Sequence, residues 1–219
     1  MSGAVAESDR QVAGDRNIGL LVEELIEAHL ALTSALVRLA DRLDLTFEEV
    51  GISGFSVSDV RYRGWLSLDS LLALAKVAPM SITRDDFLKR VLDVAILWEG
   101  LQHAPLRNMV RKLGIGTKEM PTGGSLRLVG TLCQLATIAR NAGYRWPDDS
   151  EHVVMQWNSE TRLPVMRGLF ALNLLRQKSV HATGQGCTST FASNRDAFGI
   201  VPTAQLAGWG GAVDLLYET

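Results

Sequence analysis

Apolar residues recur along most of this chain at the three- to four-residue spacing of an α-helix. The clearest run covers 16–45, where leucine, isoleucine and valine alternate with acidic and basic residues at that period. We therefore expect an all-α protein built as a helical bundle. The other segments expected to be helical are 67–78, 84–113, 126–141, 163–182, 188–198 and 208–218.

Several residues mark where these helices begin and end. Thr83 precedes two aspartates and is expected to cap the helix that follows it, while Pro105 should kink or break that helix. Gly143 suits the end of the 126–141 helix, and Pro164 suits the first turn of the next one. The segment 51–64 contains glycines and β-branched residues without a helical period, so we expect a loop with a short strand there.

The expected helices suggest a division into parts. The first residues, 1–15, are small, polar and charged, and are expected to form a disordered tail without a secretion signal. A linker-like stretch at 117–124 separates an N-terminal helical region, 16–116, from a C-terminal helical bundle, 117–219. The second part has roughly the size of a small domain.

Composition limits the classes of function. The 219 residues are 47% hydrophobic and 21% charged, with a net charge of −2, so any contact with nucleic acid must come from a local patch. The two cysteines, Cys133 and Cys187, have no spacing typical of a disulfide framework or a metal site. No apolar run reaches the roughly 18 residues that a membrane span needs. We expect a cytoplasmic protein without metal or cofactor.

Arg176 and His181 are the strongest candidates for a catalytic site in the sequence. They lie near the end of the expected helix 163–182, and their spacing places them about 140° apart around its axis. A helix C-terminus favours a protonated imidazole, which suits a group that moves a proton. A guanidinium can hold a phosphate through two hydrogen bonds. The pair could therefore cleave RNA by attack of the ribose 2′-hydroxyl, without a metal.

The stretch from Asn173 to His181, Asn-Leu-Leu-Arg-Gln-Lys-Ser-Val-His, resembles the signature of the HEPN superfamily, an arginine and a histidine separated by a short spacer near the end of a helix. The stretches at 198–202 and 208–217 are also similar to the tails of HEPN-like proteins of bacterial defence systems. The resemblance implies a HEPN-like bundle and a homodimeric endoribonuclease in antiviral defence or a toxin–antitoxin system. It implies catalysis by Arg176 and His181, with Asn173, Gln177 and Lys178 contacting RNA phosphate.

One position departs from that family pattern and keeps a second function open. The residue after the arginine is Asn, Asp or His in most active members, and here it is Gln177, whose amide can still hydrogen-bond phosphate. The alternative function is a non-catalytic interaction or regulatory subunit of a larger complex, with a partner protein and a degenerate HEPN scaffold. The acidic net charge favours this alternative.

Other candidate features allow two interpretations each. A basic region could follow a phosphate backbone or could be a solvated helix face; it comprises Arg107, Arg111, Lys112, Lys118 and Arg127. The glycine-rich stretches at 122–125 and 184–187 lack the ending of a phosphate-binding P-loop and are expected to be turns that end helices. His29 lies inside an apolar helical run and is expected to be partly buried rather than catalytic.

Overall fold

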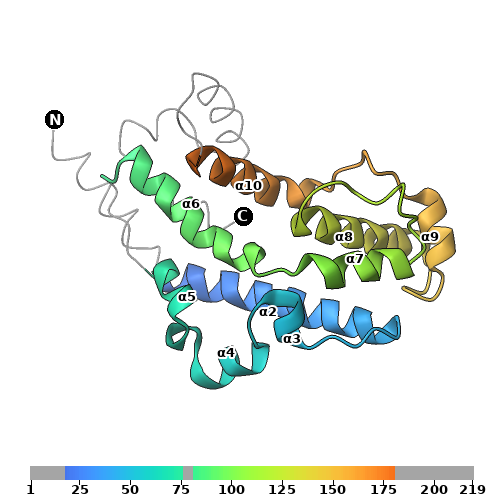
Figure 1. The fold of residues 1–219 in the computed structure, drawn as a ribbon, viewed down its shortest axis with the longest axis horizontal. Helices are drawn as coiled ribbons and strands as arrows, with labels where there is room; N and C mark the ends of the chain where they lie inside the picture. The colour runs from blue at the N-terminus through green and yellow to red at the C-terminus, as the bar shows by residue number, and fades with distance from the viewer. Residues whose placement is uncertain (1–17, 76–80, 181–219) are drawn as a thin grey trace.

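The computed structural model describes residues 18–75 and 81–180, and every element in those two ranges is helical (Figure 1). The expected all-α class is therefore confirmed for this part of the chain. None of the described helices is both long enough and apolar enough to cross a lipid bilayer. The expected tail 1–15 and the expected helices 188–198 and 208–218 lie outside the described residues.

The elements follow the chain from an initial long helix to a last helix that precedes residue 181. Their bounds are α2 (Ile18–Arg42), α3 (Glu49–Ser53), α4 (Val57–Arg63), η1 (Trp65–Ser67), α5 (Asp69–Leu72), η2 (Ala73–Ala75), α6 (Arg84–Glu99), α7 (His103–Lys112), α8 (Ser125–Ala142), α9 (Ser150–Gln156), η3 (Pro164–Met166) and α10 (Arg167–Val180).

The long helices pack side by side around one apolar core. Helix α10 lies along α6, and α7 lies along α8, while α2 supports the short helices that follow it (Figure 1). The buried apolar side chains form one cluster that runs from Val22 on α2 to Leu175 on α10. Helices on both sides of the expected linker 117–124 thus contribute to the same core, and the division into two domains stays a prediction.

Helix α6 begins with the cap that its sequence predicts. The Thr83 hydroxyl oxygen accepts a hydrogen bond from the Asp86 amide at 3.2 Å, and the Asp86 carboxylate accepts one from the Thr83 amide at 3.4 Å. This reciprocal arrangement satisfies two backbone donors that the first helical turn leaves unpaired. The hydrogen bond from the Thr83 hydroxyl is also the main reason why the pKa of Asp86 is lowered.

The helical run 84–113 is interrupted, as Pro105 predicts. Helix α6 ends at Glu99, and α7 begins at His103, which places Pro105 in the first turn of α7. A proline is tolerated there because the first-turn amides have no partner within the helix. Gly100 fills the corner between the two helices, where a Cβ atom would lie only 2.3 Å from the Ser53 carbonyl oxygen.

The expectation of a loop and strand at 51–64 is wrong, because the segment contains two short helices. Helix α3 ends at Gly54, which adopts a left-handed conformation with φ of 83°, and Ser56 then caps α4 by accepting from the Asp59 amide at 3.1 Å. Helices of five and seven residues are too short to show a clear period in the sequence. Their buried β-branched residues, such as Val57, therefore suggested a strand instead.

The segment 67–78 is also less regular than one helix. It contains η1, α5 and η2 in succession, each of three or four residues, up to Ala75. By contrast, the long helices at 126–141 and 163–182 are confirmed over the described residues. Gly143 ends α8 in the left-handed conformation with φ of 72°, and Pro164 stands at the first position of η3, which leads into α10.

Candidate anion-binding groove

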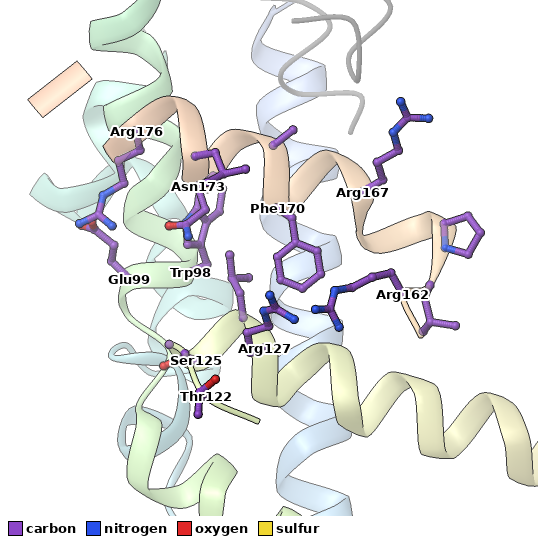
Figure 2. A pocket seen from close by; sticks show the side chains of 17 residues that line it. Trp98, Glu99, Thr122, Ser125, Arg127, Arg162, Arg167, Phe170, Asn173 and Arg176 are labelled. Carbon is purple, nitrogen blue, oxygen red and sulfur yellow. The ribbon is translucent and has the colours of Figure 1, made fainter. Parts of the chain in front are cut away.

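A groove of about 950 Å³ opens between α10, the end of α6 and the beginning of α8 (Figure 2). One wall comes from α10, which presents Phe170, Asn173 and Arg176. The opposite side comes from the loop and first turn around residues 122–127, and the connection at 162–164 closes one end. Three segments that are distant in the sequence therefore meet at this groove.

Positive charge dominates the groove. Among the described residues, four arginines line it, namely Arg127, Arg162, Arg167 and Arg176, whereas Glu99 is the one acidic residue that does so. The whole chain, by contrast, has a net charge of −2. An anion that enters the groove would therefore meet a local field opposite in sign to that of the protein as a whole.

Arg176 lies in this groove and contacts Glu99. Its guanidinium Nη2 forms an ion pair with Glu99 Oε1, which joins α10 to the last residue of α6 (Figure 2). The side chain of Arg176 is 34% exposed and that of Glu99 is 41% exposed, so water screens their attraction. Exposed pairs of this kind contribute about 0.2–1 kcal/mol. A phosphate could therefore replace Glu99 as the partner of Arg176 at small cost.

Arg127 and Arg162 lie further along the groove. Figure 2 shows their guanidinium groups directed toward one another, from the first turn of α8 and from the connection before η3. The Arg127 guanidinium carbon lies 5.5 Å from the centroid of the Phe170 ring, within the range of a cation–π interaction. Arg162 Nη1 donates to the Ser159 carbonyl oxygen at 2.9 Å. Within residues 18–75 and 81–180, neither arginine forms an ion pair with a carboxylate.

The loop before α8 is held close to these arginines. Gly123 has φ of 141°, and a Cβ atom there would lie 2.8 Å from Arg127 Cγ, so glycine allows the arginine stem to pack over the loop. The Ser125 hydroxyl donates to the Leu101 carbonyl oxygen at 2.6 Å, which fixes the loop to the corner after α6. Gly124 stands directly before α8, and no side chain caps the first turn of that helix. The positive end of this helix therefore adds to the field of the groove.

Trp98 forms part of the inner surface of the groove. Its side chain is 7% exposed, and its indole Nε1 is buried without a hydrogen-bond acceptor among the described residues. A buried N–H group without an acceptor costs about 1–3 kcal/mol.

The structure brings together two of the site residues that the sequence predicts. Arg176 and Asn173 both line the groove. Gln177 and Lys178 lie in the next turn of α10, and His181 lies directly after its last described residue, outside the described part of the chain. The pairing of Arg176 with His181 thus stays a prediction.

Most residues that line the groove could not be identified from the sequence. From the expected basic region, Arg127 lines it, whereas Arg107, Arg111 and Lys112 lie on α7 away from it. Two groove arginines, Arg162 and Arg167, were missed altogether. The sequence signal that could have indicated them is their position on either side of Pro164, where a loop turns into a helix.

The glycine-rich stretch at 122–125 was expected to end a helix, and this expectation is wrong. The stretch leads into α8 instead. Gly124 is the residue that precedes α8, and the stretch lines the groove. It still has neither the lysine nor the preceding strand of a P-loop. The stretch at 184–187 lies outside the described residues. Among residues 18–75 and 81–180, no three histidine, cysteine or acidic side chains gather in a way that could hold a metal ion.

Comparison with known proteins gives no relative for this chain. No protein-family model, no curated protein and no solved structure matches it. A function for the chain therefore rests on the residues of the groove and on the motif at the end of α10.

Proposed function

We propose that the chain binds RNA in the groove between α10, the end of α6 and the beginning of α8, and cleaves it there as a metal-independent endoribonuclease of the HEPN type. Arg176 contacts the scissile phosphate, and His181 transfers the proton. The observation that supports this proposal is the position of Arg176, which lies in the same groove as three further arginines. An isolated arginine at the end of a helix would be compatible with many functions, but an arginine in a cationic groove suits a polyanion.

The chemistry needs only groups that the chain and RNA supply. The ribose 2′-oxygen attacks the neighbouring phosphorus, and the bond from phosphorus to the 5′-oxygen of the next nucleotide breaks. His181 accepts or delivers the proton, while Arg176 offsets the negative charge that develops on the phosphate oxygens. The products are a 2′,3′-cyclic phosphate and a 5′-hydroxyl group. DNA resists because it lacks the 2′-hydroxyl.

The support for placing the two proposed groups together comes from the end of helix α10. The helix extends to Val180, so His181 follows it immediately in the sequence, five residues after Arg176. The negative end of a helix favours a protonated imidazole at this position. Asn173, one turn before Arg176, lines the same groove and is proposed to hydrogen-bond the RNA backbone together with Gln177 and Lys178.

The resemblance to HEPN ribonucleases also suggests the assembly and the biological setting. One chain contributes one Arg/His pair, and such enzymes generally place two pairs opposite each other. We therefore propose a homodimer with the α10 helices close to the two-fold axis. The setting that we propose is bacterial antiviral defence or a toxin–antitoxin system, in which a partner protein regulates the activity.

The Arg176–Glu99 ion pair favours one alternative function. If this pair is a permanent structural tie between α10 and α6, Arg176 is not available to a phosphate. The chain would then be a non-catalytic interaction or regulatory subunit. The Gln177 departure from the family pattern agrees with that alternative.

Cleavage of matched RNA and DNA strands in excess chelator separates the two functions. The nuclease predicts that RNA is cut, that DNA of the same sequence is intact, and that the RNA fragments end in a 2′,3′-cyclic phosphate. Light scattering of the same preparation should show a dimer at micromolar concentration. Loss of all cleavage upon chelation, or fragments with other ends, would contradict the proposed chemistry. Intact RNA, with a strict monomer, would favour the non-catalytic subunit.

A further inference from the structure

The proposed cleavage chemistry gives no role to Arg127 and Arg162, the two arginines that face each other in the groove. We infer that Arg127 and Arg162 form a clamp for a second phosphate group of the bound RNA strand, distinct from the phosphate that Arg176 contacts. This inference rests on the proposed function because it takes the ligand to be RNA. The clamp concerns binding alone, and it would persist in a protein that binds RNA without cutting it.

The geometry of the two guanidinium groups is the first reason. Figure 2 shows them directed toward one another from different segments of the chain. Two positive groups in this arrangement repel each other unless an anion lies between them. No carboxylate of the described residues takes that place, since neither arginine has an ion pair there. A phosphate can accept two hydrogen bonds from each guanidinium, so it suits the position between them.

The second reason is that both side chains are already held in place. The Arg127 stem packs over Gly123, and its guanidinium lies on the Phe170 ring. The Arg162 guanidinium is itself held by a hydrogen bond from its Nη1 to the Ser159 carbonyl oxygen. A clamp that exists before the ligand arrives loses little side-chain freedom on binding.

The clamp is separate from the place where Arg176 lies. Arg176 contacts Glu99 at the end of the groove near α6, whereas Arg127 and Arg162 lie toward the connection before η3 (Figure 2). Phe170 and Asn173 project from α10 between these two positions. A single strand that follows α10 would therefore meet Arg176 with one phosphate and the clamp with another.

The experiment measures binding of a short RNA in which every 2′-hydroxyl is methylated, so that the strand cannot be cleaved by the proposed chemistry. Its affinity is measured by fluorescence anisotropy at several salt concentrations. For single strands, each neutralised phosphate contributes about 0.7 to the slope of log K against log salt. The variants are Arg127→Gln, Arg162→Gln and the double variant. Arg111→Gln, an exposed arginine on α7 outside the groove, is the matched control.

A shared phosphate predicts a specific pattern of slopes. The double variant should lose about 0.7 of the slope, neither single variant should lose more than that, and Arg111→Gln should keep the wild-type slope. Arg162 is exposed, so its replacement should not change the melting temperature, and it tests the clamp even if Arg127→Gln destabilises the fold. An unchanged slope in the double variant, or no binding by the wild type, would overturn the clamp. A loss of about 1.4 would also overturn it, because the arginines would then hold separate phosphates.

These outcomes are distinguishable from a failure of the proposed nuclease. If natural RNA is not cleaved but the methylated strand shows the predicted slopes, the catalytic proposal fails and the clamp stands. If RNA is cleaved but the slopes do not change, the clamp fails and the catalytic proposal stands.

Discussion

Arg176 on α10 and Glu99 on α6 form an ion pair at one end of a groove that is otherwise lined by positive charge. The glutamate carboxylate and a phosphate present the same kind of oxygen acceptors to a guanidinium. Under the proposed function, Glu99 would therefore compete with an RNA phosphate for Arg176. Because both side chains are partly exposed, a phosphate would displace the carboxylate at small energetic cost.

Glu99→Gln should strengthen RNA binding. The amide keeps the size of the side chain, but it removes the one carboxylate that lines the groove among the described residues, and with it the ion pair to Arg176. An exposed pair contributes about 0.2–1 kcal/mol, so the affinity should rise by up to about fivefold. Asp93→Asn on α6, which removes a carboxylate outside the groove lining, is the control and should leave the affinity unchanged. Weaker binding by Glu99→Gln would mean that the pair positions Arg176 for RNA rather than competing with it.

Arg176→Ala should lower the rate of RNA cleavage by about 10²–10³-fold, since it removes a group that stabilises charge in the transition state. Arg176→Lys should recover only part of this loss, because an ammonium group cannot make the two-pronged contact. Single-turnover cleavage rates test both variants, with Arg111→Ala as the control that removes an exposed arginine elsewhere. Full activity in Arg176→Ala would exclude this residue from catalysis.

Gly100→Ala should destabilise the fold by about 1–3 kcal/mol. The added Cβ atom would lie 2.3 Å from the Ser53 carbonyl oxygen, so either α3 or the end of α6 must shift. Gly51→Ala is the matched control, since a Cβ atom on that helical residue meets nothing within 4 Å. It should be neutral or stabilising by about 0.5–1 kcal/mol. Urea denaturation measures both changes, and equal stability of the two variants would contradict the close contact.

The protein should lose stability as the pH falls from about 6.5 to about 4, in part because of His29. This side chain is 8% exposed, and burial lowers the pKa of His29 from 6.5 to about 4. In that window the unfolded chain binds the proton and the folded chain does not, so acid favours unfolding, by up to about 3 kcal/mol. His29→Leu should show less of this loss between pH 6.5 and 4 than the wild type.

His152→Leu, which replaces an exposed histidine on α9, serves as the control for His29 and should follow the wild-type curve. Urea denaturation at a series of pH values gives the free energy of unfolding of all three proteins. Parallel curves for the wild type and His29→Leu would show that His29 does not contribute to the acid sensitivity.

Long helices and their caps could be predicted from the sequence because their signals are local. The period of α8 covers 18 residues, and the Thr83 cap needs only the residues that follow it. Helices α3 and α4 were missed for the opposite reason, since five and seven residues cannot establish a period. Their helical state depends on packing against the long helices, which no local pattern records.

The groove could be predicted only in part, for a related physical reason. Arg176 and Asn173 lie on one helix, so their spacing alone places them near one another. Arg127, Arg162 and Glu99 come from three other segments, and they meet Arg176 only because α10 packs on α6 and lies over the start of α8. Such tertiary neighbours leave no trace in the spacing of residues along one helix.

The most direct test of the central claim is RNA cleavage in excess chelator by the wild type, His181→Ala and the control His152→Ala. His181→Ala removes the proposed proton-transfer group, so its rate should fall by about 10²–10⁴-fold, while His152→Ala should cleave like the wild type. Equal cleavage by wild type and His181→Ala would contradict the proposal that this histidine and Arg176 cut RNA in the groove.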